Sequence, residues 1–423
     1  MKRTLWILLA VGLSGTAHGA GFSIYEQGAR ALGTGGAYTA RVADPTAIFF
    51  NPAALTRIEH GELVLGSSLI VITREFAGVN QFPGNDTKET SPTQAFFPTH
   101  LFWGQSFSPK FGAGFGIYVP FGLTTEWENP DQFSGRFIST RASILPIYFN
   151  PAVAVEPVPG LRLGGGVMGV YSTLELNRHV GEPNPLNNPV VLDLGTVELK
   201  ASNGLDFGYN LGVQIDAGDR VQIGVNYRSS VNLGFKDGDA DFTFTGSGTA
   251  LDPVLVDLFP QDQKVSTEVK LPALLVGAVA VKPGARWVLE VDLGWTRWSE
   301  FKAIVLEFED PSLNTSLVQN WEDALFIRTG MEYDLDPRTR LRLGYYYDET
   351  PQPTAAVSPI LPDQNRHGLS AGVGRDWGKW SGDLFGLLLL AADRETGETN
   401  REGYAGSYAN SAWILGLSVS YRY

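Results

Sequence analysis

The residue types that most often carry chemistry are sparse in this chain. It has no cysteine, and its histidines after the first twenty residues stand alone, without the His-x-x-x-His spacing of a metal site: His60, His100, His179 and His367. The glycine-rich run G-T-G-G at 33–36 lacks both a preceding strand and the Lys-Ser/Thr of a phosphate loop. No G-x-S-x-G occurs. A Ser/His/acid group stays open, because such a group is defined in space rather than along the chain. We therefore expect no metal, no cofactor and no enzyme.

The first nineteen residues have the pattern of an export signal. Lys2 and Arg3 precede an apolar stretch at 5–13 that is too short to span a bilayer, and Ala17-His18-Gly19 is a small-x-small cleavage site. We expect residues 1–19 to be a signal peptide, cut before Ala20. The net charge of −13 argues against a nucleic-acid partner, and only 18% of residues are charged, which is low for a soluble protein.

The C-terminal stretch at 412–423, A-W-I-L-G-L-S-V-S-Y-R-Y, places apolar residues at every second position and aromatic residues at both ends. Successive side chains of a strand point to opposite faces, so one face is apolar and the other is small or polar. Aromatic rings at both ends favour a strand that crosses a lipid bilayer. Similar segments recur from Glu62 onward, and their charged residues fall on the opposite, luminal face: Arg228, Glu290, Asp292, Arg340 and Arg342. A soluble jelly roll or propeller is the alternative.

The connections between these segments alternate between short turns and long polar excursions, as periplasmic turns and outer loops do in outer-membrane barrels. This rhythm predicts an all-β fold, a fourteen-stranded antiparallel transmembrane barrel over 61–423, preceded by a compact, irregular segment at 20–60. The expected strands are 62–73, 96–107, 111–120, 142–156, 161–176, 201–216, 220–230, 264–281, 286–298, 321–333, 339–348, 366–374, 380–394 and 411–423.

Several motifs along the whole chain resemble the FadL family of outer-membrane transporters. They include A-G-F-S-I-Y-E-Q-G at 20–28, F-F-N-P-A-A-L at 49–55, Y-V-P-F-G-L-T-T-E-W at 118–127, W-T-R-W-S-E-F at 295–301, D-E-T-P-Q-P at 348–353 and L-P-D-Q-N-R-H-G-L-S at 361–370. The resemblance implies a monomeric barrel plugged by an N-terminal hatch at 20–60. It also implies passive uptake of long-chain fatty acids or other hydrophobic molecules through an outer apolar groove, an internal pocket and a lateral exit into outer-membrane lipid, beneath the lipopolysaccharide.

The resemblance also suggests site residues. Phe22 matches the position that reaches into the internal pocket, Asn51, Pro52 and Ala53 match the hatch motif facing the wall opening, and Asp348 matches a strand acid near the hatch. Arg366 is expected either to bind a carboxylate headgroup or to pair with an internal acid. The apolar loop at 251–259 is the candidate groove, unless it packs against neighbouring loops: Leu251, Val254, Leu255, Val256, Leu258 and Phe259.

The substrate itself stays open at this stage. No headgroup cation is assigned from sequence, so uptake of aromatic hydrocarbons is the alternative to uptake of long-chain fatty acids. A general porin and a barrel enzyme are the more distant alternatives.

Overall fold

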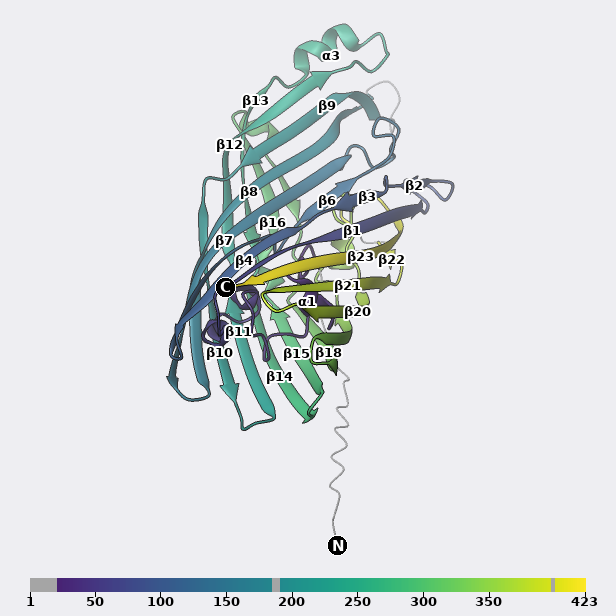
Figure 1. Ribbon diagram of the computed structural model, residues 1–423. Helices are drawn as coiled ribbons and strands as arrows, with labels where there is room; N and C mark the ends of the chain where they lie inside the picture. Colours follow the sequence, from purple (N-terminus) through teal and green to yellow (C-terminus); the bar gives the residue numbers. More distant parts are fainter. Residues whose placement is uncertain (1–20, 185–190, 397–399) are drawn as a thin grey trace.

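Fourteen strands form a closed antiparallel barrel in the computed structural model, which describes residues 21–184, 191–396 and 400–423 (Figure 1). Each strand pairs with the next in the list below, and the last closes on the first through the register Glu62↔Arg422 to Gly78↔Gly406. The strands are β1 (Glu62–Gly78), β4 (Thr99–Ser108), β5 (Phe111–Tyr118), β7 (Arg141–Val158), β8 (Leu161–Pro183), β10 (Asp206–Asp216), β11 (Val221–Arg228), β14 (Leu274–Gly284), β15 (Trp287–Thr296), β18 (Ala324–Asp336), β19 (Thr339–Asp348), β20 (Arg366–Asp376), β21 (Trp380–Ala391) and β23 (Gly406–Arg422). The predicted fourteen-stranded barrel is confirmed.

The two faces of the wall separate as the alternation predicts. In β23 the outward residues Leu415 and Leu417 are 50% and 53% exposed, whereas Ile414 between Trp413 and Leu415 is 2% exposed. Of the five charged residues assigned to the lumen, Arg340 is half-buried and the other four are buried: Arg228, Glu290, Asp292 and Arg342. Aromatic pairs such as Trp287–Tyr333 and Trp380–Tyr421 lie at the short-turn end of the wall. An apolar outer face with aromatic rims is the surface that a bilayer requires.

A second group of strands extends the wall at the long-loop end, where the figure shows them rising above the rest of the barrel (Figure 1). They are β9 (Val191–Ser202), β12 (Val231–Phe244), β13 (Gln263–Leu271), β16 (Ala303–Phe308) and β17 (Thr315–Val318), and they pair with β8 and with one another. Helix α3 (Asp252–Leu258) connects β12 to β13. Two kinds of prediction were wrong here. The segment 264–281 is two strands, β13 and β14, separated at Pro272, which has no N–H to donate. Three of the expected long loops, at 177–200, 230–263 and 299–320, contain regular structure: β9 lies largely in the first, β12 and α3 in the second, and β16 and β17 in the third.

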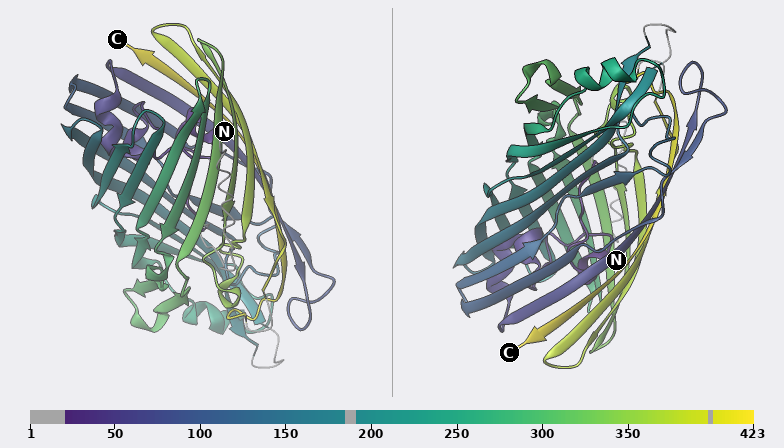
Figure 2. Two further views of the ribbon diagram at one scale, coloured as in Figure 1. Left: turned by 90° about the horizontal axis from the view of Figure 1, so that it is seen from below. Right: turned by 90° about the horizontal axis from the view of Figure 1, so that it is seen from above.

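The N-terminal segment that precedes β1 lies among the barrel strands in both views of Figure 2. It contains α1 (Ala29–Leu32), α2 (Ala47–Phe50) and the 3₁₀ helix η1 (Pro52–Arg57). Leu32, Phe49, Phe50 and Leu55 are all at most 1% exposed, so this segment carries much of the core. We call residues 21–61 the hatch. The predicted signal peptide falls on residues that lie outside those the structure describes.

Shorter elements complete the fold. They are β2 (Lys88–Thr90), β3 (Gln94–Phe96), β6 (Leu123–Glu126), η2 (Trp298–Glu300), η3 (Pro311–Leu313), η4 (Thr354–Ala356) and β22 (Arg394–Glu395). Within the described ranges, every helix is too short or too polar to cross a membrane.

Candidate functional site: an internal cavity beside a break in the wall

A cavity of about 720 Å³ lies between the hatch and the barrel wall. This is within the usual size range for small-molecule sites. Its lining is predominantly apolar and comes from the hatch, β1, β7, β18 and the segment after β5; the side chains include Phe22, Ile70, Ile72, Phe121, Ile144 and Phe326. Such a lining holds hydrophobic molecules through burial, at about 25 cal/mol per Å² of apolar surface removed from water.

The wall beside this cavity is broken between two neighbouring strands. β4 pairs with β5 only as far as Leu101↔Ile117. Farther toward the long-loop end, β3 stays with β1 and β6 stays with β7, and the described registers contain no pairing between β3 and β6. Residues on both edges of the break line the cavity, among them Phe97, Pro98 and Leu123. The cavity therefore meets the outer face of the barrel at this break.

The segment at the break, residues 119–122 between β5 and β6, bends inward and is held by the hatch. The N–H of Ile24 donates to Pro120 O at 2.8 Å, and the N–H of Gly122 donates to Phe22 O at 2.9 Å. The side-chain amide of Gln27 donates to Val119 O at 2.7 Å. These bonds satisfy backbone groups that the interrupted sheet leaves without a partner.

Phe22 lies at the centre of an aromatic cluster with Phe121, Trp298, Phe301 and Trp321, at centroid distances of 4.8–6.0 Å. On the far side of this cluster is a smaller apolar groove, which Phe22 also lines. The groove lies among β7, β8, β13, β16 and β17, and its side chains include Leu174, Leu176, Val269, Ile304, Leu306 and Leu317. Phe22 therefore borders both the outer groove and the internal cavity, as do Leu123 and Ile144.

Four arginines line the cavity, and their partners differ. Arg328 donates to both oxygens of Asp348, at 3.1 and 3.0 Å, and Arg366 lies 3.5 Å from Asp363 and donates to Gly21 O at 2.6 Å. Arg228 lies 4.2 Å from the centre of the Phe49 ring and donates to Phe49 O. Among the described residues, the fourth, Arg74, takes part in no ion pair.

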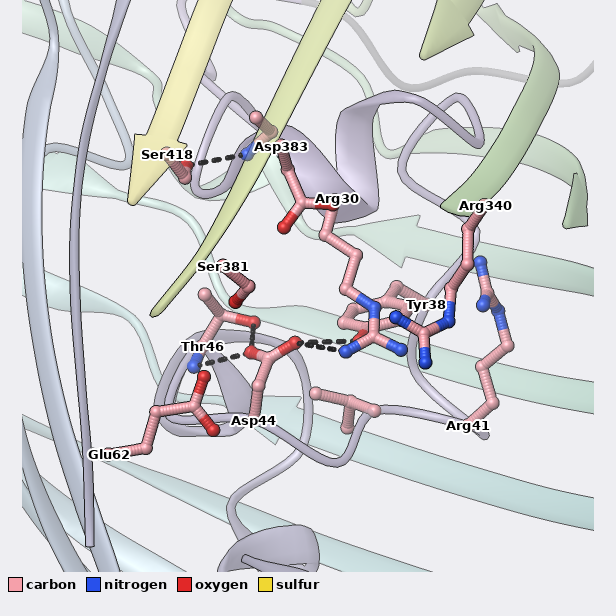
Figure 3. A network of polar contacts seen from close by, with 12 residues as sticks. Arg30, Tyr38, Arg41, Asp44, Thr46, Glu62, Arg340, Ser381, Asp383 and Ser418 are labelled. Atoms are coloured by element: carbon pink, nitrogen blue, oxygen red, sulfur yellow. Dashed lines mark hydrogen bonds and ion pairs between the residues drawn. The ribbon is translucent and has the colours of Figure 1, made fainter. Parts of the chain in front are cut away.

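The hatch contains a network of polar contacts around Asp44 (Figure 3), and neighbouring ion pairs of Arg41 fix the hatch to the barrel. Asp44 accepts from Tyr38 and Thr46 and lies 3.6 Å from Arg30. Arg41 lies 3.1 Å from Glu290 of β15 and 3.3 Å from Glu332 of β18. The backbone N–H groups of residues 38–40 donate to Asp292 and Glu290. This network ties the hatch to the inner face of β15 and β18.

The structure places the motif Asn51-Pro52-Ala53 against β8 and β10 rather than at the break between β4 and β5. Asn51 donates to Val213 O at 2.9 Å, and a Cβ at Gly164 would lie 2.4 Å from the Ala53 nitrogen. The bare backbones of Gly164 and Gly212 create the space in which the motif packs. The motif anchors the hatch, and its role as a gate stays a prediction.

The predicted groove at 251–259 is mostly helical and divides into two faces. Leu251, Leu255 and Phe259 pack toward Leu192 and Leu194, while Val254, Val256 and Leu258 are 62%, 42% and 75% exposed. None of these residues lines the internal cavity or the smaller groove. The alternative prediction of packing against neighbouring loops thus describes half of the segment, and a binding role for the exposed half stays a prediction.

Three other predicted site residues do come together at the cavity: Phe22, Asp348 and Arg366. Arg366 has an internal acid as partner, which is the second of the two predicted alternatives. Sequence reasoning missed Phe121, Trp298 and Arg74. For Arg74 a signal existed, because it is the one cation in the sequence of β1 and falls on the inward face of that strand.

Comparison with known proteins places these features in a family. The chain is 26% identical over 464 residues to a putative outer membrane protein of Neisseria meningitidis serogroup B, with coverage of 100% of this chain and 99% of that one. It is 24% identical over 447 residues to the long-chain fatty acid transport protein of an Escherichia coli O6:H1 strain, covering 99% and 98%.

Two solved structures show the same fold. A Pseudomonas aeruginosa FadL homologue superposes with a TM-score of 0.84 at 18% identity, covering 95% of this chain and 100% of that one. The toluene transporter TbuX of Ralstonia pickettii superposes with a TM-score of 0.71 at 17% identity, with the same coverage. The family model "Outer membrane protein transport protein (OMPP1/FadL/TodX)" matches residues 10–423. The chain therefore belongs to the OMPP1/FadL/TodX family, as an outer-membrane barrel that transports hydrophobic compounds and is not an enzyme.

Proposed function

We propose that this protein admits long-chain fatty acids passively, from an outer apolar groove through the internal cavity and sideways through the break between β4 and β5. The composition of the cavity wall is the observation that supports fatty acids as the substrate class. The wall is predominantly apolar, as an acyl chain requires, and it contains Arg74, a cation for which the described chain supplies no carboxylate. A bound fatty acid brings that carboxylate with it.

The proposed exit through the break is supported by a comparison with the other possible path, which leads past the hatch. Below the cavity the hatch is tied to β15 and β18 by buried ion pairs, and opening that path means separating Arg41 from Glu290 and Glu332. The break already lacks strand pairing and leads toward the hydrocarbon of the membrane. Movement of a long apolar tail into that hydrocarbon is favourable, because it removes apolar surface from water.

Aromatic hydrocarbons are the second candidate substrate, and one observation favours them. The rings around Phe22 form an aromatic cluster in which an uncharged ring finds edge-to-face partners. A toluene transporter also shares the fold. An aromatic hydrocarbon, however, leaves Arg74 without a counter-ion.

The test is uptake of radiolabelled oleate and of radiolabelled toluene by cells that express the protein, compared with cells that lack it. We expect oleate uptake to rise with expression and to saturate, and toluene uptake to change little. Toluene uptake without oleate uptake would refute the assignment in favour of the second candidate. Free conduction of ions across a planar bilayer would instead indicate a general porin.

Deleting Asn51-Pro52-Ala53 tests the hatch. The deletion removes the anchor at Gly164 and Gly212 but no wall strand, so we expect the barrel to assemble and oleate uptake to fall. Heat-modifiable migration on gels verifies assembly. Unchanged uptake by an assembled variant would contradict a role of this motif in transport.

A further inference from the structure

The guanidinium of Arg74 spans the break in the wall. Its Nη1 donates to the side-chain oxygen of Gln94 in β3 at 3.4 Å and to the backbone oxygen of Thr124 in β6 at 3.3 Å. These two strands are the edges that fail to pair with each other. Both contacts are long for hydrogen bonds, so the bridge is weak.

Arg74 is also an under-compensated buried charge. The residue is 8% exposed and lines the cavity. Its two contacts are to neutral oxygens, and its Nε and Nη2 have no hydrogen-bond partner in the described chain. A buried cation without a counter-ion is costly. By contrast, Arg328 and Arg366 in the same cavity are already paired with Asp348 and Asp363.

Arg228 is the other cavity arginine that has no acidic partner among the described residues, and it is less suited to bind a ligand. It is 3% exposed, lies over the Phe49 ring and donates to Phe49 O, so the hatch covers it. Arg74 instead stands on β1 beside the break, in line with Ile70 and Ile72, which line the cavity.

We propose that Arg74 is the specificity-determining residue of this transporter: it binds the carboxylate of the substrate and, in doing so, gives up its bridge between β3 and β6. A carboxylate offers the unpartnered Nε and Nη2 two parallel charge-assisted hydrogen bonds. These bonds are stronger than the two long contacts of Nη1, so they draw the guanidinium toward the ligand and away from Gln94 and Thr124. Release of the bridge frees the two edges to separate beside the bound acyl chain. Headgroup recognition is thereby coupled to the width of the lateral exit. This inference rests on the proposed uptake of fatty acids through the break.

Equilibrium binding of a ligand pair tests the recognition step. The full-length protein in detergent is titrated with oleate and with oleyl alcohol, which has the same tail without the charge, in wild type, Arg74→Gln and Arg74→Lys. Loss of a charge-assisted pair is expected to weaken oleate binding by Arg74→Gln about ten- to a hundredfold. Oleyl alcohol binding is expected to change less than about twofold, and Arg74→Lys to recover most of the oleate affinity.

The control variant is Arg375→Gln, which removes an arginine at the opposite end of the wall, outside the cavity. It is expected to bind both ligands as wild type does. Equal oleate affinity in wild type and Arg74→Gln would overturn the inference while leaving the proposed function intact. An equal loss for both ligands would also overturn it, because that result indicates a structural role. No oleate binding or uptake by wild type would refute the proposed function itself.

A distance measurement tests the coupling to the exit. The chain has no cysteine, so spin labels at Ala95→Cys and Thr124→Cys report only on the two edges of the break. Both substitutions leave the Arg74 contacts in place, because those contacts use the Gln94 side chain and the Thr124 carbonyl. In the labelled protein that keeps Arg74, we expect oleate to lengthen the distance between the two spin labels. In Arg74→Gln the bridge is absent and the distance is already long, so we expect oleate to leave it unchanged. A distance that does not respond to oleate in the Arg74 protein would refute the coupling.

Discussion

The buried ion pairs of Arg41 are expected to hold the hatch against the barrel, and Arg41→Gln measures how strongly. The Arg41 side chain is 6% exposed, and the Glu290 side chain it faces is fully buried at 3.1 Å. Removing one partner of a buried pair typically costs about 3–5 kcal/mol. Glu332 keeps Arg342 at 2.6 Å, so only Glu290 loses its cation, which favours the lower value of about 3 kcal/mol.

Hydrogen exchange of backbone amides measures this loss of stabilisation between the hatch and the wall. The amides of Tyr38, Thr39 and Ala40 donate to Asp292 and Glu290, so they exchange only when this part of the hatch leaves the wall. A loss of about 3 kcal/mol corresponds to exchange that is faster by roughly 150-fold. The assay is mass spectrometry of the peptide covering 36–44 in detergent-solubilised protein, with peptides from β20 and β21 as internal references.

Two variants separate charge from packing. Arg340→Gln removes an arginine whose pair with Asp334, at 3.5 Å, is partly exposed on both sides; such pairs contribute about 0–1 kcal/mol, so exchange should rise less than about fivefold. Arg41→Met combined with Glu290→Gln removes both charges and should return exchange to within about tenfold of wild type. If Arg41→Gln exchanged at the wild-type rate, the network in Figure 3 and its extension to β15 would not be what holds the hatch.

Three further predictions concern the path of the substrate. Phe22→Ala removes the ring that borders both the outer groove and the cavity, and loss of a buried Phe costs about 3–5 kcal/mol. The amides of Ile24 and Gly122 should therefore exchange faster with solvent, while the barrel keeps its heat-modifiable migration on gels. Gly164→Ala places a Cβ 2.4 Å from the Ala53 nitrogen and should displace the hatch and reduce oleate uptake, whereas Gly277→Ala, which meets nothing within 4 Å, should leave uptake unchanged. Val254→Ser with Leu258→Ser should reduce uptake at limiting oleate without changing the maximal rate, and unchanged uptake would show that α3 does not capture substrate.

The barrel was predictable from sequence because lipid imposes a simple rule. Outward residues must be apolar, so alternation along β15 or β23 identifies a wall strand and its inner face. The rule fails above the membrane. β12 carries four charged residues, so its segment was predicted to be a loop. β13 alternates as a wall strand does, because a sheet in water also buries one face, so it was merged with β14. Pro272, where β13 ends and β14 is about to begin, was the available signal for dividing that segment.

The site was less predictable because its features depend on which groups are absent from the three-dimensional surroundings of a residue. The role proposed for Arg74 rests on the absence of a carboxylate near its guanidinium in the described structure, and no pattern along β1 encodes that absence. Likewise the place of Asn51-Pro52-Ala53 depends on two glycines far along the chain, Gly164 and Gly212. Phe22 was identified through family resemblance. Its place at the border of two spaces, in contact with Trp298 and Trp321, could be seen only in the structure.

The hatch and the break in the wall depend on each other. A break in a membrane sheet leaves backbone groups without partners, and hydrocarbon offers them none. Here the hatch supplies what the sheet lacks: Ile24 and Gln27 donate to Pro120 and Val119, and the Phe22 carbonyl accepts from Gly122. The segment that packs inside the barrel is thus the same segment that pairs with residues 119–122 at the break. A barrel without its hatch is therefore expected to lose the exit as well, because residues 119–122 would regain their hydrogen bonds only by pairing across the break.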